Sequence, residues 1–306
     1  MSKTLIRAAK APKSGKMYNR GAWKYALPAF IPLVLLSVVP LSQAIWTAFT
    51  DNVAGFNVEV KFIGFENFRR LAGDSLFWAS FKIGIIWAVS VTLLALVLGF
   101  GLALLLNQKL RFLGLMRVLS LVPWAMPPVI VAIMWNLLLR PTSGPIDGIL
   151  EFFHVPGAKT DWLGDFNTAF PTVILIGAWV AMPIITVSIL AAIQGIPSDM
   201  IEAATIDGAN AWQRFRFITV PTVRAITTAL VALNIIWNFS SFGLVFVLTA
   251  GGPGGKTFVP ALFAYNEAFK YGNFGYAASM GVVMALAIVL MLGVYLKASK
   301  REDTQR

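Results

Sequence analysis

Long apolar segments are the feature that most restricts what this chain can fold into. Six of them run for about 20–28 residues each, and a helix needs about 20 residues to cross the hydrocarbon core of a bilayer. We place these segments at about 26–49, 79–106, 117–139, 169–193, 222–249 and 276–297. With 58% hydrophobic residues and a mean hydropathy of +0.74, the chain is too apolar for a soluble domain. The sequence therefore predicts an all-α polytopic membrane protein in which residues 26–306 form one six-helix domain.

The distribution of basic residues predicts how the spans are oriented. Residues 1–25 carry several lysines and arginines and no acid, in a tail that cannot bury a core. Most of the 25 lysines and arginines lie in this tail, in the loops after the second and fourth spans and at the C-terminus. Because basic loops stay on the cytoplasmic side, we expect both termini and the 195–221 loop to be cytoplasmic. The net charge of +11 is then a signal of topology and of contact with membrane lipid, and we expect no nucleic-acid partner.

Residues 195–221 form a polar island between the fourth and fifth spans. Pro197 should end the preceding helix, Ser198 is a good N-cap, and a carboxylate such as Asp199 suits the first turn of a new helix. A short helix is therefore expected over about 199–207, lying at the membrane surface.

The same island contains a spaced motif. Glu202-Ala203-Ala204 is followed after three residues by Gly208, and after nine more by Ile218-x-Val220-Pro221. Gly208 can adopt the positive φ that a turn requires, and Pro221 should mark the start of the next span.

This spacing resembles the EAA loop of bacterial ABC importer permeases, written EAA-x3-G-x9-I-x-L-P. Only Val220 departs from it, where leucine is usual. The resemblance implies a type I ABC importer permease fold in the bacterial inner membrane, with a coupling helix that docks on an ATPase subunit. By the same resemblance, Glu202 fixes the internal hydrogen bonds of the loop and Gly208 permits its turn. The coupling residues are then Glu202, Ala203, Ala204, Asp207 and Gly208.

Two segments between the spans extend the resemblance to carbohydrate importers. Gly64-Phe65-Glu66-Asn67-Phe68 resembles their G-x-x-N-F segment, and 248–257 resembles L-T-x-G-G-P followed by Thr. This is typical of the first of two non-identical permeases in importers of the maltose and glycerol-3-phosphate kind. The implied partners are a second homologous permease, two ATP-binding subunits and a periplasmic or lipid-anchored solute-binding protein.

The central parts of the spans lack Asp, Glu, Lys, Arg and His, but they contain amide, hydroxyl and indole groups. Sugars are bound by such groups, and an unpaired amide in lipid costs several kcal/mol, so these side chains should face the protein interior or a cavity. By resemblance to maltose-type permeases, the stretch before 248–253 lines the sugar pathway. Alternatively, these groups only join neighbouring helices through hydrogen bonds. The candidate pathway residues are Trp237, Asn238, Ser240, Ser241, Phe242, Trp179 and Asn136.

The chain has no credible nucleotide site of its own. Residues 250–257 formally match a relaxed phosphate-loop pattern, but they leave a membrane span on the outer side, and Pro253 removes a backbone N–H donor. We therefore expect a transport subunit, not an enzyme, with no cofactor and no metal site. Two alternatives stay open: the same architecture importing glycerol phosphate or another non-sugar solute, and an ATP-independent secondary carrier. A carrier usually needs an ionisable residue in the central part of a span, and the sequence has none there.

Overall fold

The computed structural model describes residues 28, 30–55, 59–155 and 159–303. The basic tail over residues 1–25 and the start of the first predicted span lie outside this part of the chain. The described residues form helices, and the one pairing of extended backbone among them is an isolated antiparallel bridge between Thr50 and Phe62. The all-α prediction is confirmed.

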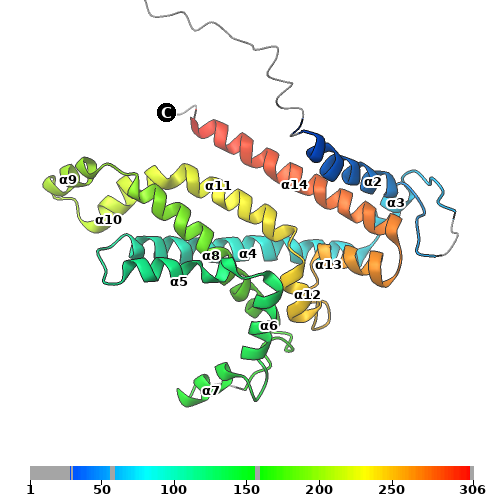
Figure 1. Ribbon diagram of the computed structural model, residues 1–306, viewed down its shortest axis with the longest axis horizontal. Coiled ribbons are helices and arrows are strands. Elements are labelled where there is room, and N and C mark those ends of the chain that lie inside the picture. The colour runs from blue at the N-terminus through cyan, green and yellow to red at the C-terminus, as the bar shows by residue number, and fades with distance from the viewer. Residues whose placement is uncertain (1–27, 29, 56–58, 156–158, 304–306) are drawn as a thin grey trace, which may run out of the picture. The chain divides into compact units, whose positions relative to one another are not determined.

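Most of the predicted spans correspond to single long helices (Figure 1). Among the described residues, five helices are long and apolar enough to cross a membrane, and the count reaches six if a bent helix pair forms one span. The helical run Phe30–Thr47, which contains η1 (Val34–Val38) and α2 (Val39–Thr47), is the first of them. The others are α4 (Ser75–Leu106), α8 (Ala169–Gln194), the run Ala211–Phe239, and Phe274–Lys297 within α14 (Phe274–Asp303).

The third predicted span is two helices instead of one. α5 (Leu113–Ala125) and α6 (Pro128–Leu138) meet at an angle of 98°. The break falls at Met126-Pro127-Pro128, where Met126 has an extended backbone. Two consecutive prolines remove two N–H donors and hold the residue before each of them out of the α conformation, so a single helix cannot continue through this point.

The fifth predicted span is also interrupted. α11 (Val220–Phe239) ends at its C-cap Ser240, and α12 (Gly243–Thr249) begins three residues later. At its other end the helical run starts earlier than expected, through α10 (Ala211–Arg214) and η2 (Phe215–Thr219). The prediction that Pro221 starts the span is therefore wrong. The five-residue π segment η2, in which the Val220 N–H donates to Phe215 O, carries the helix into the proline, which has no N–H to contribute.

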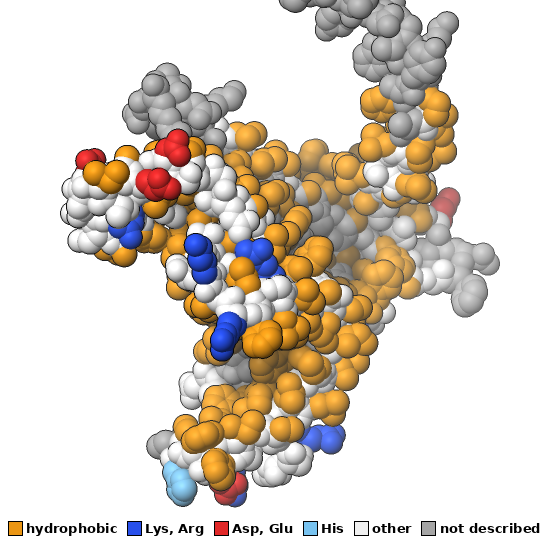
Figure 2. All heavy atoms as spheres, turned by 60° about the vertical axis from the view of Figure 1, so that its left-hand side comes forward, with side chains coloured by type: hydrophobic (Ala, Val, Ile, Leu, Met, Phe, Trp, Pro, Cys, Tyr) orange, Lys and Arg blue, Asp and Glu red, His pale blue; other side chains and the backbone are white. Residues whose placement is uncertain are grey.

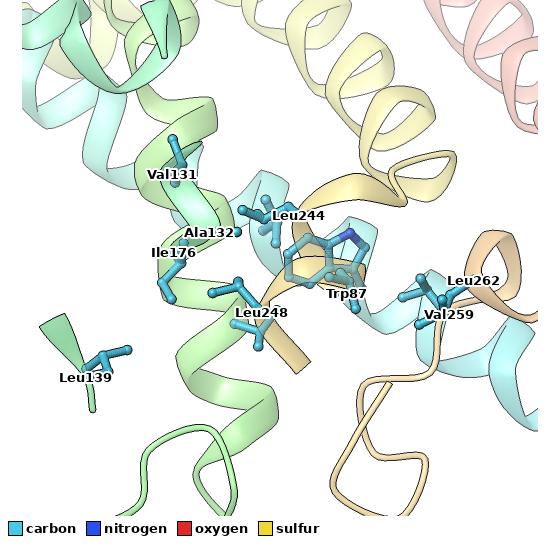
Figure 3. Close-up of a cluster of buried hydrophobic side chains, with 12 residues drawn as sticks. Trp87, Val131, Ala132, Leu139, Ile176, Leu244, Leu248, Val259 and Leu262 are labelled. Carbon is cyan, nitrogen blue, oxygen red and sulfur yellow. The ribbon is translucent and has the colours of Figure 1, made fainter. Parts of the chain in front are cut away.

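The core is built around α4. This helix packs most extensively against α8 and also against α11, while α6 packs against α12. Trp87 of α4 is 1% exposed, and Figure 3 shows it among leucine and valine side chains of α12 and of the segment that follows it. Glycine makes the α4–α8 contact possible, because a Cβ at Gly177 would lie 2.5 Å from Trp87 Cη2.

The outer surface is apolar. Hydrophobic side chains cover most of the face seen in Figure 2. Leu115, Val118 and Leu119 on α5 and Val97 on α4 are each more than half exposed. Large exposed apolar surfaces of this kind are liabilities in water, whereas they suit a helix that faces lipid or another membrane subunit.

The segments that resemble carbohydrate-permease motifs have structural roles. Near α3 (Glu66–Ala72), Asn67 is buried and its Nδ2 donates to Ala48 O and Thr50 O. In the turn after α12, Thr257 Oγ1 lies 2.7 Å from Thr249 Oγ1 and donates to Gly252 O at 2.8 Å. Both segments therefore shape the loops between spans, with α13 (Pro260–Tyr265) and η3 (Asn266–Lys270) completing the connection to α14.

Candidate functional site

The polar island between α8 and the fifth span folds into a short helix and a tight turn. α9 (Ser198–Ile206) matches the predicted helix within one residue. The expected N-cap is wrong: Ser198 is already inside the helix, Pro197 occupies the N-cap, and Ser198 Oγ donates to Asp199 Oδ1 at 3.2 Å. α8 has ended by then at Gln194, before Pro197.

The turn after α9 is braced by short-range bonds. Gly208 has φ +79°, as the sequence predicted, and Asp207 N and Ala209 N donate to Ala203 O and Ala204 O. A reciprocal capping box then starts α10: Gln213 N donates to Asn210 Oδ1, and Asn210 N donates to Gln213 Oε1.

The side chain that holds this turn is not the predicted one. The Glu202 side chain is exposed and bonds to no other described residue. Arg214 Nη1 instead donates to Ala209 O at 2.6 Å, directly across the turn. Ile206 is 86% exposed and Trp212 is 66% exposed, and the acidic residues Glu202 and Asp207 are exposed as well. The loop therefore presents both apolar and acidic side chains to its surroundings.

A cavity of about 260 Å³ lies among α4, α8, α11 and the two helix breaks. Its polar and aromatic lining includes three of the predicted pathway residues, Trp237, Asn238 and Ser241. No ionisable side chain lines it. The remaining lining residues are Trp87, Trp124, Pro128, Gly177, Val180, Ala181, Ile184, Asn234 and Leu244.

Asn238 lies where α4 and α11 meet at this cavity. Its Nδ2 donates to Asn234 O at 2.8 Å and to Thr92 Oγ1 at 3.5 Å, and its backbone carbonyl accepts from Trp87 Nε1 at 3.0 Å. Asn238 therefore joins two helices and also lines the cavity. Asn234, one turn earlier, is 2% exposed and bonds to Leu230 O.

The other four predicted pathway residues lie away from this cavity. Ser240 is exposed and its Oγ donates to Ile236 O, whereas Phe242 packs on Phe246 and Tyr265 with ring centroids 5.1 Å and 4.7 Å apart. Trp179 meets Trp135 edge to face. Asn136 Nδ2 donates to Val247 O at 3.1 Å, so it ties α6 to α12, and it lines a second cavity.

Sequence reasoning missed Trp87, Trp124 and Asn234 as cavity residues. Asn234 carried a usable signal, since a buried amide in a lipid-spanning helix needs a polar environment. Trp87 carried none, because a tryptophan within an apolar run is equally typical of a packed core. Trp124 reaches the cavity only because the chain bends at Met126-Pro127-Pro128.

Comparisons with known proteins agree with this architecture. Residues 95–302 match the family described as binding-protein-dependent transport system inner membrane component. The trehalose/maltose transport system permease protein MalF of Thermococcus litoralis is 31% identical over 274 residues, which cover 90% of this chain and 92% of that protein. The diacetylchitobiose uptake system permease protein NgcF of Streptomyces coelicolor is 30% identical over 82% of this chain and 74% of its own length.

A solved structure shows the same fold. A chain from a bacterial ABC transporter involved in the import of the acidic polysaccharide alginate superposes with a TM-score of 0.78, covering 92% of this chain and 96% of that chain at 21% identity. Permeases of this kind are multi-pass inner-membrane subunits. They pair with a second permease, work with separate ATP-hydrolysing subunits and receive solute from a binding protein, so the chain is not an enzyme. The chain belongs to the binding-protein-dependent transport system inner membrane component family and is a permease subunit of an ABC importer.

Proposed function

We propose that this permease conducts a sugar through the cavity that contains Trp87 and Asn238. One observation carries the proposal: the cavity combines indole rings with amide and hydroxyl groups and has no ionisable side chain in its lining. Neutral donors and acceptors suit sugar hydroxyls, and aromatic faces suit the C–H face of a sugar ring. The names of the relatives MalF and NgcF, which refer to trehalose, maltose and diacetylchitobiose, favour the same cargo.

Within the cavity, the roles of the residues follow from their positions. Asn238 and Ser241 offer hydrogen-bonding groups, while Trp124 and Trp237, which are 55% and 57% exposed, offer aromatic surface. Trp87 acts as a positioning residue, because its indole N–H holds the carbonyl of Asn238. Asn136, Trp179, Ser240 and Phe242 belong to the surrounding framework of the pathway.

The loop from α9 to α10 would couple this pathway to ATP hydrolysis. Ala203 and Ala204 accept the backbone bonds of the turn, Gly208 supplies its positive φ, and Glu202 and Asp207 carry charge on the outside of the loop. We assign Glu202 to contact with the ATPase subunit, because its side chain is exposed and takes no part in bracing the turn.

Both termini and the α9–α10 loop are proposed to be cytoplasmic. The chain has no cysteine, so a single cysteine introduced into it reports orientation in intact cells without background from the rest of the chain. Lys159→Cys, in the loop after α7 (Pro145–Phe152), should react with a membrane-impermeant maleimide, and Arg111→Cys should react only after lysis. The reverse pattern would overturn this orientation.

Uptake into proteoliposomes tests the cargo. The full complex, with its binding protein and ATP, is offered trehalose, maltose, glycerol 3-phosphate and an amino acid, each radiolabelled. We expect uptake of a sugar and a loss of about tenfold in Asn238→Leu, because one or more hydrogen bonds between neutral groups are removed from the site. Ser240→Ala is the matched control, since Ser240 lies two residues away but outside the cavity. Uptake of glycerol 3-phosphate or the amino acid alone would replace the sugar proposal.

A further inference from the structure

A second cavity lies beside the first along the same two helices. It measures about 400 Å³, within the range of roughly 300–1,000 Å³ that is usual for ligand sites. α6 and α12 border both cavities: Pro128 and Leu244 line the one described above, and Asn136 and Val247 line this one. We call the first the inner cavity and the second the outer cavity, because the loop that follows α6 lies on the outer side in the proposed orientation.

The outer cavity has a continuous wall on α6. Ile133, Asn136 and Leu137 line it, and their spacing of three and four residues places them on one face of α6. Arg140, just beyond the end of the helix, lines the cavity as well. Leu244 and Val247 are three residues apart on α12, a rise of about 4.5 Å, and Pro128 and Asn136 are eight apart, a rise of about 12 Å. The two cavities are thus close enough for one elongated ligand to extend from the inner cavity into the outer one.

Polar groups in the outer cavity keep part of their hydrogen-bonding capacity unused. Arg140 and Asp161 both line it, yet they form no ion pair with each other or with any other described residue. Asp161 Oδ1 accepts from Gly164 N at 2.9 Å, which fixes the carboxylate, and Asn136 uses its Nδ2 on Val247 O. A guanidinium, a carboxylate oxygen and an amide oxygen are therefore available beside the apolar surface of Ile133, Leu137 and Leu163.

We propose that the outer cavity is a second saccharide subsite, which holds the outer ring of an oligosaccharide whose inner ring occupies the inner cavity. Paired donors and acceptors of opposite charge suit a neutral, hydroxyl-rich ligand, because hydroxyls can donate to Asp161 and accept from Arg140 at the same time. A strongly anionic or cationic ligand would meet one of the two charges unfavourably. The inference rests on the proposed function and extends it from a sugar to a sugar of at least two rings.

The alternative occupant is a protein surface, either the binding protein or the second permease. The two cases differ in their dependence on sugar length. A subsite affects only sugars that reach it, whereas a protein contact affects every transported sugar equally.

The test measures uptake into proteoliposomes of the full complex with glucose, trehalose, maltose, maltotriose and maltopentaose. The variants are Arg140→Gln, which removes the charge and shortens the side chain, and Asp161→Asn, which removes the charge with little change in shape. Lys159→Gln is the matched control, because Lys159 is an exposed charge of the same loop that lines neither cavity and pairs with Glu151. For each sugar, variant uptake is divided by unmodified uptake, so the selectivity of the binding protein cancels.

We expect this ratio to fall about tenfold for the longest transported sugar relative to the shortest in both variants, because a hydrogen bond to a charged group is lost. Lys159→Gln should show no dependence on length. An equal fall for all sugars, or no fall, overturns the outer subsite and leaves the sugar proposal standing. Failure of the unmodified complex to transport any of the five sugars overturns both.

Discussion

The α9–α10 loop and the inner cavity are stabilised in opposite ways. In the loop, the bracing bonds join residues three to five positions apart, as between Asn210 and Gln213 or Arg214 and Ala209. At the inner cavity, bonds between helices join residues far apart, with 151 positions between Trp87 and Asn238 and 146 between Thr92 and Asn238. The loop is largely exposed, while Trp87 and Asn234 are almost completely buried.

This difference separates two kinds of mutational effect. A loop braced by its own residues can lose its shape without disturbing the helix packing, so its variants should change coupling and leave stability intact. The cavity exists only where α4, α8 and α11 pack together, so its variants should change transport and stability together. Three variants and their controls test that separation.

Gly208→Val should have the largest effect. The open space around Gly208 excludes a clash as the cause, so the only obstacle is its φ of +79°, which costs about 1–2 kcal/mol for an ordinary L-residue and more for a β-branched one. We expect stimulation of ATP hydrolysis by loaded binding protein to fall about 30-fold, as 2 kcal/mol implies. Gly208→Asn is the control, because asparagine tolerates positive φ. Equal loss in both variants would show that side-chain bulk, not backbone conformation, matters here.

Trp87→Phe should reduce uptake about tenfold and lower the melting temperature of the complex. The change removes the indole N–H from the part-buried carbonyl of Asn238, which still accepts from Ser241 N at 3.1 Å, so one hydrogen bond, worth about 0.5–1.5 kcal/mol, is lost. Trp78→Phe in the same helix is the matched control, since Trp78 lies in the first turn of α4, its Nε1 bonds to Leu71 O and Ala72 O of α3, and it lines neither cavity. If Trp78→Phe lowers uptake as strongly, the loss of uptake comes from any tryptophan change in α4 and not from the bond between Trp87 and Asn238.

Asn210→Ala should have the smallest effect. It removes the N-cap of α10, worth about 1 kcal/mol, from a loop that Arg214 also braces. We expect a fall of a few-fold in stimulated hydrolysis with an unchanged melting temperature, measured on the same purified complex. Asn210→Ser keeps a capping side chain and should behave like the unmodified chain. A clear drop in melting temperature would show that the loop is not structurally independent.

The sequence predicted the loop better than the cavity, for a physical reason. α9, the positive φ at Gly208 and the spans depend on local spacing and hydrophobic runs, which can be read directly from neighbouring residues. The lining of the cavity depends on which distant helices meet, and Trp87 and Trp124 reach it through packing and a proline bend that no local pattern locates. The prediction for Pro221 failed because the π segment before it allows the helix to continue through the proline.

The division between coupling loop and sugar cavity is tested most directly by the number of ATP molecules hydrolysed per sugar transported, measured in the same proteoliposomes for Gly208→Val and Asn238→Leu. We expect Gly208→Val to lose stimulated hydrolysis and uptake together. Asn238→Leu should keep stimulated hydrolysis and lose uptake, so its ratio of ATP to sugar rises about tenfold. Equal losses of hydrolysis and uptake in Asn238→Leu, or uptake that persists in Gly208→Val without stimulated hydrolysis, would contradict the division between coupling loop and sugar cavity.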